Sequence, residues 1–226
     1  MTIPDFIEIA IKEAKHTINK INKDDLDAHQ NFVLSMLDVL HAYAETALKA
    51  WQQDALLAIP LLTRSILETH VELLLTIKDP AHYINMKEKQ ARANKETFKV
   101  MSERRNLENS NVDWESMHKM LNQLLKDQGK ELKSIQNQFK EVKFTEIYDT
   151  LYRQLSKYTH PSLSLMRDIR NGSVNSQQYH KIFLRRIAKD LWHATNQTFI
   201  FCGYPVLQHS KNFILLKPSY KNAINQ

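Results

Sequence analysis

The residues of the sequence whose types best suit chemistry are an arginine and a histidine near the end of one predicted helix, because these two residue types together can act on a phosphodiester. Arg153 and His160 are seven residues apart. On a helix this is almost two turns, so both side chains fall on one stripe, about 10 Å apart along the axis. Asp149 and Ser156 fall on the same stripe. A guanidinium can hold a phosphate through paired hydrogen bonds, and an imidazole can transfer a proton near neutral pH. The stripe could therefore carry acid–base chemistry, or it could be the solvated face of an amphipathic helix.

The Arg-x6-His spacing at the end of a predicted helix resembles the R-x4–6-H motif of the HEPN superfamily. The resemblance implies a metal-independent endoribonuclease, of the kind that serves as a toxin or antiviral defence effector. It further implies a homodimer in which two motif helices form one composite site. In that site His160 would act as general base or acid on the ribose 2′-hydroxyl, and Arg153 would hold the phosphate and stabilise the transition state. The implied partners are RNA, a second copy of the chain and, for a toxin, an antitoxin or another protein.

A second pattern connects a distant segment to the same helix. It pairs R-x-x-x-E with Y-x-x-x-S-x-x-x-H-x-S, and its members are Arg64, Glu68, Tyr152, Ser156, His160 and Ser162. The pattern resembles that of a family of uncharacterised bacterial helical proteins, which offers no activity to carry over. The resemblance implies that these six residues lie together in space.

Arg64 and Glu68 are spaced for an ion pair within one helix, in a strongly apolar segment. Because burying a charge without a partner is costly, we expect both side chains to be largely buried and to contact each other or the helix from Tyr152 to His160. The cluster is either a structural salt bridge that links two helices or a polar site assembled with Ser156 and His160. The structural interpretation supports the alternative function, a non-catalytic helical interaction or scaffold module.

Glycine is scarce, with 3 residues among 226, whereas an average protein has about 7%. Tight turns between strands need glycine, so its scarcity argues against a large β-protein or a nucleotide-binding α/β fold. We therefore predict an all-α helical bundle. The net charge is +6 and the sequence pI is about 9.2. Arg167 and Arg170, which follow the predicted helix of Arg153, are candidate phosphate-binding residues.

Apolar residues recur at intervals of three and four through most of the chain, which predicts the helices that must position these side chains. The expected helices begin near Pro4, after a turn at 22–24 with a capping Asp, near Ala55, at Thr145 and at Gln177. The helix from Ala55 is apolar almost all round, so it belongs at the centre of the bundle. The last helix is expected to span Gln177 to Phe201.

We expect one domain over residues 1–226. Within it, residues 81–142 are rich in Lys, Arg and Glu with few apolar anchors, and they are predicted to form an inserted, extended helical arm that is mostly solvated. Residues 205–226 form a basic C-terminal tail.

Glu-x-x-His on bundle helices is a ligand pattern of di-iron proteins. Five acid–His pairs have this spacing: Glu13/His16, Asp38/His41, Asp79/His82, Glu115/His118 and Asp190/His193. Their predicted positions are exposed or at the edges of apolar stripes, so we interpret them as pairs on exposed helix faces. The expectation is no metal and no cofactor.

Cys202 is the single cysteine, which excludes an intramolecular disulfide, and it is expected to be a small buried apolar residue. Charged residues interrupt the N-terminal segment, and the longest apolar run, 55–62, is too short to cross a bilayer. These features predict a cytoplasmic protein without a membrane span.

Overall fold

The computed structural model describes residues 3–84, 86, 94, 133–159, 166–167, 170–171 and 177–205. Every regular element in these ranges is a helix, which confirms the predicted all-α fold. His160, Ser162 and the C-terminal tail beyond residue 205 lie outside the described residues, as does most of the predicted arm. Among the described residues, no helix combines the length and the apolar character needed to cross a membrane.

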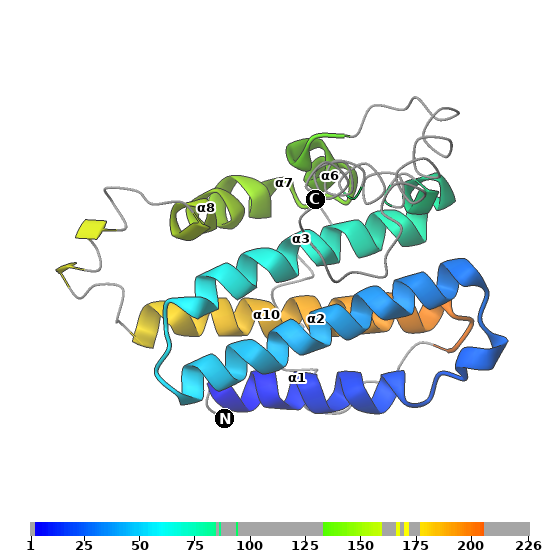
Figure 1. Ribbon diagram of the computed structural model, residues 1–226, viewed down its shortest axis with the longest axis horizontal. Helices are drawn as coiled ribbons and strands as arrows, with labels where there is room; N and C mark the ends of the chain where they lie inside the picture. The colour runs from blue at the N-terminus through cyan, green and yellow to red at the C-terminus, as the bar shows by residue number, and fades with distance from the viewer. Residues whose placement is uncertain are drawn as a thin grey trace, which may run out of the picture.

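Four long helices form the core of the bundle (Figure 1). They are α1 (Ile3–Ile18), α2 (Ala28–Gln52), α3 (Ala58–Lys78) and α10 (Gln177–Phe201). α10 packs against the other three, and α2 packs against both α1 and α3. The last helix has the bounds that the sequence predicts, and α3 occupies the expected central position.

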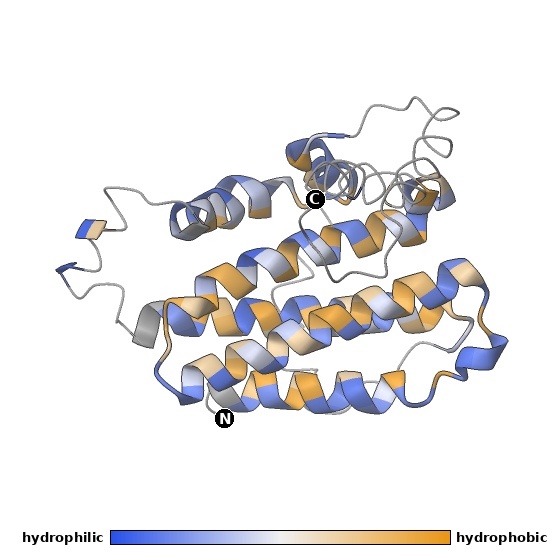
Figure 2. Ribbon diagram, in the orientation of Figure 1, coloured by the Kyte–Doolittle hydropathy of each residue, from blue (hydrophilic) through white to orange (hydrophobic). Residues whose placement is uncertain are grey.

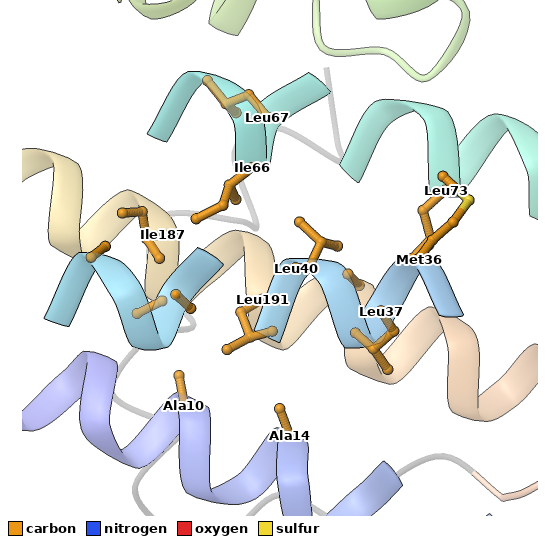
Figure 3. Packing of buried hydrophobic residues seen from close by; sticks show 14 of the residues in the cluster. Ala10, Ala14, Met36, Leu37, Leu40, Ile66, Leu67, Leu73, Ile187 and Leu191 are labelled. Atoms are coloured by element: carbon orange, nitrogen blue, oxygen red, sulfur yellow. The ribbon is translucent and has the colours of Figure 1, made fainter. Parts of the chain in front are cut away.

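The interior of this four-helix core is a single apolar cluster. Each helix turns its apolar stripe inward, as the orange bands in Figure 2 show. Ala10 and Ala14 point from α1 into the bundle, toward the layer that holds Leu37, Ile187 and Leu191 (Figure 3). Side chains this small let α1 approach its neighbours closely, and burial of the larger ones supplies about 1.5–3 kcal/mol each.

Helix starts and ends follow local chemistry. The cap of α2 is Asp27, whose carboxylate accepts from the backbone of Gln30 in a reciprocal capping box. The predicted turn at 22–24 is present, but Asn22 caps a short 3-10 helix, η1 (Lys23–Asp25), before α2 begins. Pro60 lies in the first turn of α3, where its missing N–H costs nothing.

A second layer, residues 133–159, covers the outer side of α3 (Figure 1). This outer layer comprises α6 (Ile135–Glu141), α7 (Thr145–Ile147), the π-helix η2 (Tyr148–Tyr152) and α8 (Arg153–Thr159). Phe139, Tyr152 and Leu155 are its buried anchors. Residues 133–142, which the sequence assigns to the solvated arm, are therefore in part packed onto the core, because Phe139 is fully buried there.

Candidate functional site

α3 is the central helix, yet it carries Arg64, Glu68, His70 and Glu72 at positions that face its neighbours. Their partners come from η2, from α10 and from the two ends of the predicted arm. Buried or partly buried polar groups are tolerated only when they are hydrogen-bonded, so each group requires its partners in place.

Arg64, Glu68 and Tyr152 form a closed ring of hydrogen bonds, called here the Arg64 cluster. Arg64 Nε donates to Glu68 Oε1 at 3.0 Å, and Arg64 Nη2 donates to the Tyr152 hydroxyl at 3.1 Å. The Tyr152 hydroxyl in turn donates to Glu68 Oε1 at 2.6 Å. The Arg64 guanidinium also lies 5.0 Å from the centre of the Tyr152 ring, close enough for a cation–π contact.

The expected contact of Arg64 and Glu68 with each other and with the helix of Tyr152 is confirmed. The expected depth of burial is not reached, because their side chains remain 21% and 40% exposed. Of the three residues in the Arg64 cluster, Tyr152 alone is buried. Burial and the Glu68 carboxylate both disfavour the phenolate, and together they raise the pKa of Tyr152 to about 12.

The π-helix η2 precedes α8 directly and ends on Tyr152. The backbone N–H of Arg153 bonds to the carbonyl of Tyr148, five residues earlier, which is the π-helical pattern. The Tyr148 and Tyr152 rings stack at 5.3 Å, and Tyr152 also packs on Phe139. Short π-helices occur frequently at functional sites.

The polar stripe of the sequence prediction is found in part. Arg153 and Asp149 are exposed, whereas Ser156 is half-buried and donates to the carbonyl of Tyr152 at 3.2 Å. Arg167 and Arg170 are exposed as well. The structure thus joins Tyr152 to Arg64 and Glu68. It does not test the placement of His160 and Ser162.

A second polar group, which we call the buried histidine chain, joins α3 to α10. His70 Nδ1 lies 3.0 Å from Asp190 Oδ1, and His70 Nε2 lies 2.9 Å from His193 Nδ1. Arg186 donates to both oxygens of Asp190, from Nε at 2.7 Å and from Nη2. Phe144 of the outer layer lies over the chain, with its ring 5.4 Å from the ring of His70 and 5.8 Å from the Arg186 guanidinium.

Asp190 is fully buried, which corrects the interpretation of Asp190/His193 as a pair on an exposed helix face. Burial alone would raise the pKa of this carboxyl, but Arg186 and His70 lower it to about 2. The sequence offers one local signal, Arg186 four residues before Asp190. His70 is a lone histidine in an apolar helix, and nothing in the sequence around it indicates a buried polar partner.

A third polar group attaches both ends of the predicted arm to α3. The Glu72 carboxylate makes a short contact with His82 Nε2 and accepts from Gln138 Nε2 at 3.1 Å. The partner of His82 is therefore Glu72 rather than Asp79, the residue three positions before it. Nearby, Glu141 pairs with Lys133, and the Lys133 ammonium helps lower the pKa of Glu141.

Metal ligation finds no support within the described residues, where no three His, Cys, Asp or Glu side chains are grouped to hold an ion. Cys202 is buried, as expected, and burial raises the pKa of its thiol to about 11. A thiol with so high a pKa is not a thiolate at neutral pH.

Residues 50–178 match a family of unknown function, DUF5677. The match spans more than half of the 226 residues. The chain belongs to DUF5677. No curated protein and no solved structure matches it.

The polar groups of this DUF5677 protein differ in whether they lie within the matched range. Arg64, Glu68 and Tyr152 all lie within it, so the Arg64 cluster is built entirely from the part of the chain that matches the family. The buried histidine chain joins His70, inside the range, to Asp190 and His193, which lie beyond it.

Proposed function

We propose that this DUF5677 protein is a metal-independent endoribonuclease, with Arg153 and His160 as its catalytic residues. The observation that carries the proposal is the exposure of Arg153. Its neighbours Tyr152 and Leu155 are buried, so α8 is attached to the core by one face and presents a guanidinium to solvent on the other. In the sequence, His160 follows Thr159, the last residue of α8.

The chemistry proposed for this pair requires no metal. His160 takes the proton of the ribose 2′-hydroxyl, whose oxygen attacks the neighbouring phosphorus, and the 5′-oxygen leaves with a proton from an acid. Arg153 holds the phosphate and stabilises the charge that builds up on its oxygens. The products are a 2′,3′-cyclic phosphate and a 5′-hydroxyl. Arg167 and Arg170, both exposed, would bind phosphates along the RNA.

The Arg64 cluster supports this proposal by fixing the start of α8. Tyr152 immediately precedes Arg153 and is held by hydrogen bonds to both charged residues of α3. A catalytic side chain on such a support loses little conformational freedom when it binds substrate. A homodimer with two such helices facing each other, acting as a toxin or defence effector, is part of the same proposal.

A second candidate function is a non-catalytic interaction module. The observation that favours it is the mutual engagement of Arg64, Glu68 and Tyr152, whose polar groups bind one another across two layers. A cluster whose polar groups bind one another can be a purely structural link between two helices, without any catalytic role. On this hypothesis α8 and the arm present a surface to a second copy or to another protein.

The experiment that separates the two candidates is RNA cleavage by the purified full-length protein in excess EDTA. We expect cleavage by the wild type and a loss of at least about 100-fold in rate for both Arg153→Ala and His160→Ala. Arg185→Ala removes an exposed arginine from α10 and is the matched control, expected to cut normally. Cleavage that survives in the Arg153→Ala, His160→Ala double variant would refute the site. Absence of cleavage by the wild type across structured and single-stranded RNAs favours the interaction module.

A further inference from the structure

Tyr148, the first residue of η2, carries an aromatic ring that its neighbours cover only in part. The ring stacks on Tyr152, with centroids 5.3 Å apart and planes 18° apart, and it also meets the Phe139 ring at 5.4 Å. No other ring of the described residues contacts Tyr148, and its hydroxyl makes no hydrogen bond within them. Because the residue is only half-buried, part of this aromatic side chain remains accessible to a ligand.

Arg153, to which we assign the phosphate of the RNA, lies directly beside Tyr148 along the backbone. The N–H of Arg153 bonds to the Tyr148 carbonyl, which closes the last π-helical turn. The Arg153 side chain is exposed and makes no ion pair or ring contact within the described residues, even though Asp149 lies four positions before it. Its guanidinium is therefore available to a ligand as well.

The π-helix determines that these two side chains share one surface. In an α-helix, residues five positions apart point about 140° away from each other. In a π-helix each residue bonds to the fifth one before it, so Arg153 lies about one turn after Tyr148 and on the same side. Helical side chains also lean toward the N-terminus of their helix, which directs the Arg153 side chain back over the turn of Tyr148.

The Tyr148 ring rests on a rigid support. Tyr152, on which it stacks, is buried and is held by hydrogen bonds to Arg64 and Glu68 of α3. A ligand that stacks on Tyr148 therefore has little side-chain order to impose, which favours binding.

An accessible aromatic ring next to an available guanidinium matches the chemistry of a single-stranded nucleotide. Unpaired bases stack on aromatic side chains, while arginine binds the adjoining phosphates. In a duplex the bases already stack on one another and are paired, so they cannot reach such a ring without being extruded.

We propose that Tyr148 is a base-stacking residue, which binds one unpaired base of a single-stranded RNA next to the phosphate held by Arg153. This inference rests on the ribonuclease function proposed above, and it adds the substrate class and a residue that selects it.

Binding of an oligonucleotide that the protein cannot cut tests the inference separately from cleavage. A 2′-O-methyl oligoadenylate of about 12 nucleotides keeps bases and phosphates, but its blocked 2′-oxygen cannot attack phosphorus. Fluorescence anisotropy with the full-length protein compares this strand with the same strand paired to its complement. We expect the wild type to bind the single strand at least about 5-fold more tightly than the duplex, and Tyr148→Leu to lose this preference because the stacking is lost.

Three further variants separate stacking from packing and from charge. Tyr148→Phe restores the ring and should restore the preference for the single strand. Tyr43→Leu makes the matched change at a half-buried tyrosine of α2, which should leave binding unaltered. Arg153→Ala should weaken the binding of single strand and duplex alike and reduce its salt dependence, because a phosphate contact is lost.

The inference is overturned if Tyr148→Leu binds the single strand as tightly as the wild type does. It is also overturned if the wild type shows no preference for the single strand or binds neither form. Should Tyr148→Leu fail to fold, the NMR signals of the Tyr148 ring in the wild type decide the matter: an upfield shift on addition of the single strand supports stacking, and unchanged signals refute it. Tyr148-dependent binding without cleavage of ordinary RNA would keep the stacking site and refute the nuclease, whereas cleavage by a protein whose binding ignores Tyr148 would do the reverse.

Discussion

Tyr152 is the residue through which the outer layer reaches the charged side chains of α3. Its hydroxyl accepts from Arg64 and donates to Glu68, while its ring packs on Phe139 and lies beneath the guanidinium. The hydroxyl and the ring therefore stabilise the contact in separable ways. Removing only the hydroxyl leaves the ring packing and the Arg64–Glu68 ion pair in place.

Tyr152→Phe should lower the free energy of unfolding by about 1–2 kcal/mol, because a hydrogen bond to a charged partner is lost and Glu68 is exposed enough for water to replace part of it. Urea denaturation measures the change. Tyr43→Phe on α2 is the control, since that half-buried tyrosine makes no hydrogen bond within the described residues. Equal losses in the two variants would show that the Arg64 cluster does not hold the layers together.

At the level of elements, three helices end in the same way. After α2, α6 and α10 the chain enters the left-handed region at Asp54, Lys143 and Gly203, and the next residue bonds back to the last helical turn. This is the Schellman arrangement, which favours glycine at the left-handed position. Of the three left-handed positions, only the one after α10 is a glycine, Gly203. A side chain at the other two positions costs about 1 kcal/mol or more.

Lys143→Gly should therefore raise the stability of the protein by up to about 1 kcal/mol, because the strain at φ 62° is relieved. Lys140→Gly makes the same substitution three residues earlier, at an exposed position inside α6, and should lower the stability by about 1 kcal/mol. Opposite shifts of the melting temperature in the two variants are the expected result. Destabilisation by both would contradict the assignment of strain to Lys143.

The elements that the sequence predicts best are those with long apolar stripes. The bounds of α10 and the buried residues of α1 follow from a period that only a helix satisfies, because those helices bury one continuous face. The π-helix at Tyr148–Tyr152 has no such signal. Its extra residue per turn accompanies contacts of Tyr152 with Arg64 and Glu68, more than 80 residues away, and no local pattern contains that information.

The candidate site, like the fold, could be predicted from the sequence only in part. Arg64 and Glu68 could be paired in advance because two charged residues four positions apart are unusual in so apolar a segment, whereas Tyr152 is grouped with them only by the resemblance of the paired motifs. Asp190 could not, since a carboxylate near the edge of a stripe is usually solvated. Its burial depends on His70, 120 residues away in the chain, and on Arg186 one helical turn before it.

For the molecule as a whole, the two layers are joined in different ways. The four-helix core shares one apolar cluster, whereas the outer layer adds polar contacts to its few buried anchors. The buried histidine chain belongs to both parts, because it ties α3 to α10 and supports Phe144. Its carboxylate, Asp190, is therefore the polar residue on which the stability of the entire bundle should depend most.

Asp190→Asn keeps the shape of the side chain but leaves Arg186 and His70 without their anion, which should cost about 3–5 kcal/mol at pH 7. Because the pKa of Asp190 is lowered to about 2, the contribution of its charge is present above pH 4 and is lost as the pH falls from 4 to 2. The stability difference between wild type and variant should therefore shrink over that interval, as measured by urea denaturation at a series of pH values. Asp24→Asn, at an exposed carboxylate of η1, should show little difference at any pH. A gap between wild type and Asp190→Asn that stays constant down to pH 2 would mean that the carboxylate acts through its shape and hydrogen bonds alone, and that its charge does not hold α3 and α10 together.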